Sequence, residues 1–162
     1  MNYKVIDTVD IDKIKQELST VEHKQTYSLQ GKYKDDDPTK YIIPANSSKN
    51  AWERSPKNQV AKDLVVPLFD LPYVNSLMNK FKIGYGRLCF LQSKTCYTYH
   101  KDISKRIHIP IETNDQCFFV LDDEVIRLPA DGSVYEVDTT KMHTFVNGSM
   151  STRTHIVGTL LD

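Results

Sequence analysis

The chain of 162 residues lacks the features that mark several large classes of protein. Its three cysteines, Cys89, Cys96 and Cys117, are odd in number and show no Cys-x-x-Cys spacing, which argues against a disulfide framework or a thiolate zinc site. No apolar run approaches the length of a membrane span, and the opening residues MNYKVIDTVDIDK lack the hydrophobic region of a signal peptide. We therefore expect a cytoplasmic protein with reduced, mostly buried thiols and no membrane partner.

The sequence also lacks an excess of charge. Its 21 Lys and Arg residues balance 21 Asp and Glu residues, so no overall field attracts nucleic acid, and we do not expect a nucleic-acid partner. The composition, 40% hydrophobic and 26% charged, is that of a globular protein. No repeat or linker divides the chain. We expect one domain over 1–162, with mixed α/β support over 1–84 and a β core over 85–162.

The first half contains both helical and extended patterns. It predicts helices over residues 11–20 and 73–81, a short strand over Thr39–Ile43, and polar loops over residues 25–40 and 44–60. Asp10 is in position to cap the first helix. Trp52, the only tryptophan, lies in the second loop, where it could belong to a substrate lid or to the core.

From Gly84 onwards the pattern is that of strands. Short apolar runs alternate with turn residues, as expected for a sandwich or barrel of antiparallel strands. The runs are GYGRLCFLQ, RIHIPIE, QCFFVLD, EVIRLP, SVYEVD, HTFVNG and RTHIVGTLL. We expect the upstream helices to cover one face of this assembly.

The run RIHIPIE has the clearest period of two. Ile107, Ile109 and Ile111 fall on one face, and Arg106, His108 and Pro110 fall on the other. The second face could meet water, as in an ordinary sandwich, or it could point into a polar site. The alternation leaves both possibilities open.

The most informative residues for chemistry are His100, Asp102 and His143. In an extended backbone, His100 and Asp102 project to the same side, and His143 comes from a later strand. Two imidazoles and one carboxylate form a facial triad, which leaves coordination positions open and suits non-haem Fe(II). Arg153 follows His143 by ten residues, which is room for a turn and a return strand, so it could bind a carboxylate beside the metal.

A His-x-Asp triplet alone is a weak signal, because it can be a surface hydrogen bond in any chain of this length. Here the triplet opens the strand-rich half, a histidine follows 43 residues later, and an arginine follows ten residues beyond that. The agreement of these features favours a metal site.

These residues resemble the Fe(II)- and 2-oxoglutarate-dependent dioxygenases, and within them the aspartyl/asparaginyl β-hydroxylase-like branch. The resemblance covers roughly Tyr85–Leu161 and includes the Arg-x-His pair that follows the His-x-Asp triplet. It implies a mainly β fold with N-terminal helices and a double-stranded β-helix core, also called a jelly roll or cupin-like core.

The resemblance also implies roles for individual residues. His100, Asp102 and His143 would hold Fe(II), Arg153 would pair with the distal carboxylate of 2-oxoglutarate, and Arg106 and His108 would help to hold that cosubstrate. Cys89 stands about where the β-hydroxylases place a serine that hydrogen-bonds the cosubstrate. The animal β-hydroxylases carry glycine where this chain has Asp102, so their substrate does not transfer to this chain.

The expected activity is hydroxylation of a protein, peptide or amino-acid side chain with O2, coupled to decarboxylation of 2-oxoglutarate to succinate. One alternative is a non-catalytic cupin-type metal-binding module. Another is an oxygenase acting on a small metabolite or a nucleobase. His155 could line the pocket or be a hydrogen-bonded core residue. Nothing in the sequence indicates an oligomeric state.

Overall fold

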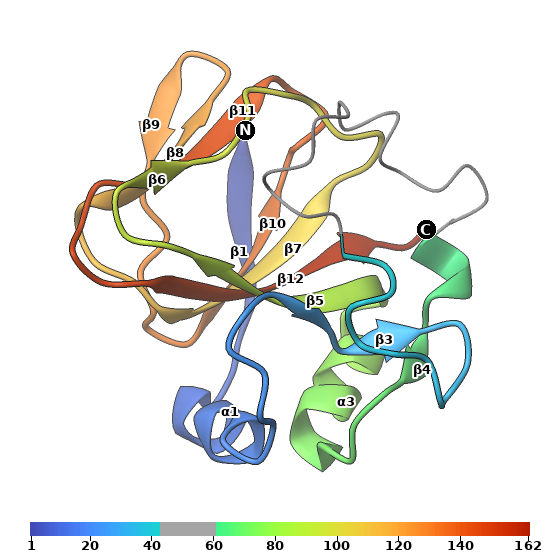
Figure 1. The fold of residues 1–162 in the computed structure, drawn as a ribbon. Helices are drawn as coiled ribbons and strands as arrows, with labels where there is room; N and C mark the ends of the chain where they lie inside the picture. Colours follow the sequence, from blue (N-terminus) through green and yellow to red (C-terminus); the bar gives the residue numbers. More distant parts are fainter. Residues whose placement is uncertain (43–60) are drawn as a thin grey trace.

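The computed structural model describes residues 1–42 and 61–162, which form a mainly β fold with two α-helices. Figure 1 shows the elements in sequence order. They are β1 (Tyr3–Thr8), α1 (Ile11–Leu18), β2 (Tyr27–Ser28), β3 (Gln30–Gly31), the 3-10 helix η1 (Ala61–Asp63), β4 (Val66–Pro67), α3 (Pro72–Lys80), β5 (Ile83–Leu91), β6 (Thr95–Cys96), β7 (Arg106–Glu112), β8 (Cys117–Leu121), β9 (Glu124–Ile126), β10 (Ser133–Val137), β11 (His143–Asn147) and β12 (Arg153–Leu160).

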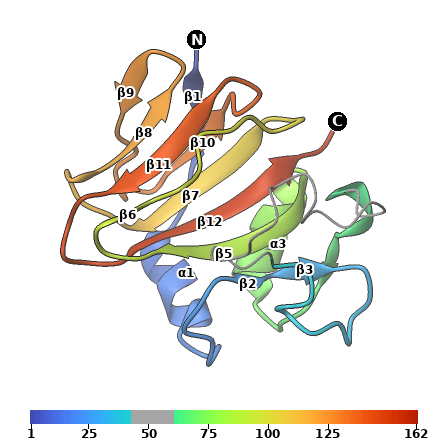
Figure 2. The same cartoon turned by 45° about the horizontal axis from the view of Figure 1, so that its top comes forward.

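The strands form two facing antiparallel sheets and a separate pair. The large sheet has the order β1-β10-β7-β12-β5-β2, and the small sheet has the order β6-β11-β8-β9. Figure 2 shows the small sheet lying across one face of the large one. Strands β3 and β4 form the two-stranded ribbon. Within the described residues the sheets do not close into a barrel. The architecture is a jelly-roll-like β-sandwich, which confirms the expected fold class.

Both helices cover the outer face of the large sheet. Asp10 caps α1 by accepting a hydrogen bond from the Lys13 backbone at 3.1 Å, as the sequence predicts. Helix α3 carries Pro72 in its first turn, where the missing N–H costs no hydrogen bond. Val74 of α3 and Ile14 of α1 are fully buried in the apolar layer between helices and sheet. The sequence prediction that the helices cover one face of the strands is confirmed.

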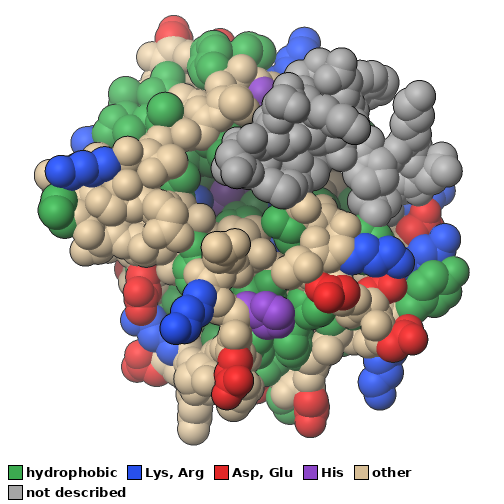
Figure 3. Space-filling model, in the orientation of Figure 1, with side chains coloured by type: hydrophobic (Ala, Val, Ile, Leu, Met, Phe, Trp, Pro, Cys, Tyr) green, Lys and Arg blue, Asp and Glu red, His purple; other side chains and the backbone are tan. Residues whose placement is uncertain are grey.

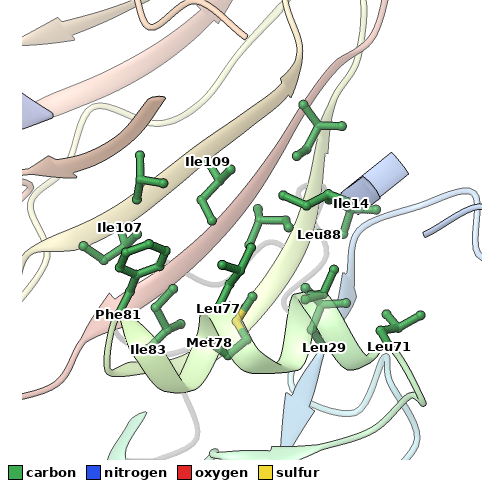
Figure 4. Packing of buried hydrophobic residues seen from close by; sticks show 14 of the residues in the cluster. Ile14, Leu29, Leu71, Leu77, Met78, Phe81, Ile83, Leu88, Ile107 and Ile109 are labelled. Atoms are coloured by element: carbon green, nitrogen blue, oxygen red, sulfur yellow. The ribbon is translucent and has the colours of Figure 1, made fainter. Parts of the chain in front are cut away.

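The apolar layer continues through the outward face of the central strands (Figure 4). Ile107 and Ile109 of β7 and Ile156 of β12 are all fully buried there. Complete burial of such a side chain stabilises a fold by about 1.5–3 kcal/mol. This face therefore contributes much of the stability of the molecule.

The inward face of the same strands is polar, which answers the question that the alternation of β7 left open. Arg106 and His108 point between the sheets, and His155 of β12 lies on the same side. His108 and His155 are buried to 0% and 1% exposure. A smaller apolar cluster, which includes Phe119, fills the rest of the space between the sheets.

Two sequence expectations differ from the structure, and one strand was not predicted. Residues 39–41 form a turn closed by the hydrogen bond from Lys40 N to Asp37 O, so the predicted strand over Thr39–Ile43 is wrong for the described part of that range. Strand β1 has no counterpart in the prediction, because only a few of its residues are apolar. Cys96 is exposed, whereas Cys89 is half-buried and Cys117 is buried.

The second predicted loop, over residues 44–60 and including Trp52, lies outside the described residues. Among the helices of the described chain, none combines the length and the apolar character needed to span a membrane.

Candidate metal centre

His100 and His143 are brought together by backbone pairing. His100 N donates to His143 O at 3.0 Å, and His143 N donates to His100 O at 2.7 Å, so the two residues form an antiparallel bridge at the start of β11. Directly opposed residues on one face of such a pair have neighbouring side chains. The two imidazole rings accordingly lie with centroids 4.4 Å apart.

Both rings are oriented by their Nδ1 atoms. His100 Nδ1 lies 2.7 Å from Thr98 O, and His143 Nδ1 lies 2.8 Å from Lys141 O. A carbonyl oxygen accepts hydrogen bonds only, so each Nδ1 carries the proton and each Nε2 has a free lone pair. Among the described residues, the buried Nε2 of His143 has no hydrogen-bond partner. Two nitrogen donors are thus available on one side of the bridge.

Asp102 completes the group. Its backbone N–H donates to Thr139 O at 2.8 Å, which fixes the loop after His100 against the chain before β11. Its carboxylate oxygens lie 3.7 Å from His100 Nε2 and 3.7 Å from His143 Nε2. One donor atom from each of the three residues lies within 4.8 Å of the others, a spacing that allows one ion to be bound by all three.

The protonation states suit metal binding. Burial acts to raise the pKa of Asp102, but the charge and hydrogen bond of Arg106 outweigh burial and hold that pKa below its usual value. Burial lowers the pKa of His143 and keeps its imidazole neutral. One anionic oxygen donor and two imidazole nitrogens form the ligand set of a 2-His-1-carboxylate site, which is typical of non-haem Fe(II).

Arg106 supports this group directly. Its Nε donates to Asp102 Oδ2 at 3.1 Å, and its Nη1 donates to Thr159 Oγ1 of β12. The sequence resemblance assigned Arg106 to the cosubstrate, and in the structure its guanidinium contacts the carboxylate of the triad. Asp102 has a second oxygen, Oδ1, on the side of His100.

Two arginines and two histidines gather between the sheets near the triad, and we call this group of side chains the cationic chamber: Arg87, Arg153, His108 and His155. Arg153, at the start of β12, is 4% exposed, and its Nε has no partner among the described residues. Its guanidinium carbon lies 5.7 Å from the ring centroid of Phe119 and 5.2 Å from that of Phe145. Burial lowers the pKa of Arg153 to about 10, so the group stays charged at neutral pH.

His108 and His155 share one contact inside this chamber. Their Nδ1 atoms lie 3.2 Å apart, and the Nε2 atom of each is buried without a hydrogen-bond partner in the described chain. Burial and the charge of Arg153 lower the pKa of both residues well below the usual value. Both rings are therefore neutral at pH 7. Cys89 of β5 lies directly opposite His155 in the pairing of β5 with β12.

Arg87 also faces this chamber, although no sequence motif marks it. Its guanidinium carbon lies 4.3 Å from the Tyr85 ring centroid, and its Nε has no partner among the described residues. Tyr85 has φ 54 beside a register shift between β5 and β12, and bulges of this kind re-aim side chains next to functional sites. The only signal in the sequence that could have found it is that Arg87 shares the alternation of Tyr85 and Cys89 along one strand. Figure 3 shows histidine side chains recessed below their neighbours on this side of the molecule.

Comparison with known families identifies the chain. The family model for aspartyl/asparaginyl β-hydroxylase matches residues 8–160. The chain belongs to this family. The sequence resemblance was clearest from Tyr85 onwards, but the match to the hydroxylase family begins much earlier in the chain. It includes the end of β1 and all of α1 and α3.

Solved structures add little beyond the family. A structure of the plu4264 protein from Photorhabdus luminescens is similar with TM-score 0.39 and 17% identity, over 44% of this β-hydroxylase-family chain and 57% of that protein. The comparison with curated proteins gave no match.

Proposed function

We propose that this member of the family is an Fe(II)- and 2-oxoglutarate-dependent dioxygenase that hydroxylates a protein, peptide or amino-acid side chain. The observation that carries the proposal is the convergence of His100 Nε2, His143 Nε2 and the Asp102 carboxylate within 4.8 Å. The family supports hydroxylation as the reaction. The donor set supports Fe(II) as the metal.

Each residue of the triad has a defined task in this proposal. The Thr98 and Lys141 carbonyls hold the two rings so that both Nε2 atoms face the ion. Arg106 holds one oxygen of Asp102, which restricts the carboxylate to a narrow range of orientations. Fe(II) with 2-oxoglutarate supplies the chemistry, in which substrate C–H and O2 give substrate C–OH while 2-oxoglutarate gives succinate and CO2.

The cationic chamber supports a dicarboxylate as cosubstrate. Arg153 offers a planar fork of donors that can bind a carboxylate through two hydrogen bonds. Its charge is buried, and a buried charge is costly unless it is paired. Phe119 and Phe145 flank the guanidinium and would exclude water from the ion pair. His108 lies against the same two phenylalanines, with ring centroids 5.1 and 5.8 Å away.

Arg153 separates this proposal from the cupin-type alternative. A cupin that binds only a metal does not need a buried cation ten residues beyond its last ligand. The unpartnered Nε of Arg153 and the unpartnered Nε2 of His108 instead suit an anion beside the metal. Small metabolites and nucleobases are the alternative substrate classes for such an oxygenase, and a substrate screen distinguishes them from peptides and amino acids.

The test is anaerobic titration of the protein with Fe(II) and 2-oxoglutarate, followed by a succinate assay in air with peptide and amino-acid substrates. We expect a metal-to-ligand absorption band in the visible range and substrate-dependent succinate. Asp102→Ala should lose coupled turnover, because it removes the anionic metal ligand. Asp123→Ala, at an exposed aspartate after β8, is the matched control and should behave as wild type.

Near-equal turnover of wild type and Asp102→Ala would show that the two histidines alone hold the metal. Absence of the absorption band in wild type would contradict the cosubstrate assignment.

A further inference from the structure

His155 has no role in the function proposed above, yet it is among the most buried polar residues of the described chain. Its Nδ1 makes the 3.2 Å contact with His108 Nδ1. The two residues come from neighbouring strands, β12 and β7, and their rings meet at an interplanar angle of 81°. The contact therefore links the strand of Arg153 to the strand of the cosubstrate histidine.

The contact restricts where the protons of the pair can be. Both rings are neutral, so four nitrogens share two protons. A hydrogen bond between two Nδ1 atoms needs one of them protonated and the other bare. The second proton then lies on the Nε2 of the ring whose Nδ1 is bare. One histidine thus presents an Nε2 donor, and the other presents an Nε2 acceptor.

The surroundings select one of the two arrangements. Arg153 lies two residues before His155 on the same face of β12, and both line a small cavity of about 10 Å³. Arg153 can only donate hydrogen bonds, and its positive charge acts on the His155 ring, which favours a bare Nε2 over an N–H on the side of that charge. The proton of His155 then lies on Nδ1 and is donated to His108.

We propose that His155 is a positioning residue: its Nδ1–H donates to His108 Nδ1, which fixes His108 as the tautomer that presents Nε2–H to a cosubstrate carboxylate. The inference rests on the proposed function for the identity of that carboxylate. The opposite arrangement would place a bare His108 nitrogen against the anion and an N–H of His155 against the donors of Arg153. Both placements would be electrostatically unfavourable.

The first experiment needs no metal and no cosubstrate. In the metal-free protein, ¹⁵N-histidine spectra should show His108 protonated at Nε2 and His155 protonated at Nδ1, with the signals assigned by single substitutions. Finding His108 protonated at Nδ1 would overturn the proposal.

The second experiment compares two substitutions of His155 by the dissociation constant for 2-oxoglutarate, measured by calorimetry with Mn(II) in place of Fe(II). His155→Asn keeps an N–H near the position of Nδ1 and should bind 2-oxoglutarate much as wild type does. His155→Leu removes the donor and should weaken binding by about tenfold or more, the usual loss for an orienting partner. In His155→Leu the His108 signal should no longer show a fixed Nε2–H tautomer.

A folded His155→Leu protein with wild-type affinity would overturn the positioning role. Failure of the wild-type protein to bind 2-oxoglutarate with Mn(II) would overturn the proposed function and the assigned ligand together. The tautomers measured in the metal-free protein test the histidine pair without any cosubstrate. Failure of the positioning role can therefore be distinguished from failure of the proposed function.

Discussion

The guanidinium of Arg153 lies against the rings of Phe119 and Phe145, and it has no carboxylate partner among the described residues. A lysine at this position would keep the positive charge but would replace the planar fork with a single ammonium group. Arg153→Lys should therefore weaken 2-oxoglutarate binding by about tenfold or more, since a hydrogen bond to a charged group contributes about 1.5–3 kcal/mol.

The measurement is the dissociation constant of 2-oxoglutarate with Mn(II), together with the unfolding midpoint in urea. The exposed Arg127 gives the control, Arg127→Lys, which should leave the affinity unchanged. Unchanged affinity in Arg153→Lys would remove Arg153 from the cosubstrate site.

Strand β7 alternates between apolar side chains that pack under the helices and side chains that face the cationic chamber. Ile109 is fully buried in the apolar layer under the helices, whereas its neighbour His108 faces the cationic chamber. Ile109→Val should lower the free energy of unfolding by about 0.5–1.5 kcal/mol. The affinity for 2-oxoglutarate should stay at the wild-type value. Urea unfolding and calorimetry measure the two effects, and Val125→Ala on exposed β9 serves as the near-neutral control for stability.

The histidine pair between β7 and β12 predicts a pH dependence of stability. The folded pKa of both residues lies well below the unfolded value of about 6.5, so the unfolded chain binds more protons once the pH falls below that value. Stability should be fully present above this pH and decrease below it. Between pH 7.5 and 5.5 the loss should be about 1.4 kcal/mol for each histidine that stays neutral.

Urea unfolding at the two pH values measures the loss, and His155→Asn should reduce it by about half because one titrating group is gone. A stability that does not change between pH 7.5 and 5.5 would contradict burial of two neutral histidines.

The elements differ in how far the sequence could predict them. The seven strand runs and the two helices have clear apolar periods, and each matches a strand or helix of the structure. The turn at residues 39–41 was missed because its residues have strand propensity, and local hydrogen bonds such as Thr39 N to Asp37 Oδ1 outweigh that propensity. The alternation of residues along β7 shows that one face is polar. It does not show whether that face meets water or the second sheet, because that depends on how the sheets pack.

The residues of the site were predictable to a similar degree. Spacing placed His100, Asp102, His143 and Arg153 in one group, and the structure brings the first three to a common point. The partnership of Arg106 with Asp102 and that of His155 with His108 depend on side-chain packing between strands. No linear pattern encodes those contacts.

At the scale of the whole molecule, metal binding should stabilise the fold. The donor atoms come from the segment after β6 and from β11, so an ion bound by all three links two distant parts of the chain. At a metal concentration 100 times the dissociation constant, the stabilisation is about 2.7 kcal/mol. For a chain of this size we expect a rise in Tm of about 5–10 °C.

Differential scanning calorimetry under anaerobic conditions, with Fe(II) and then with a chelator, measures this shift. Asp102→Ala should show a smaller rise than wild type, and Asp123→Ala should show the full rise. An identical rise in Asp102→Ala would show that Asp102 is not a ligand of the ion.

The backbone bridge between His100 and His143 has a consequence for metal selection during synthesis of the protein. As the chain leaves the ribosome, His100 and Asp102 emerge first and offer only two donors, until β11 is complete and has paired. Flexible nitrogen and oxygen donors follow the general affinity order, which favours copper over iron. Since the third donor arrives only with the folded sandwich, the proposed function predicts that the complete ligand set, and with it selection of the metal by coordination geometry, forms only after folding.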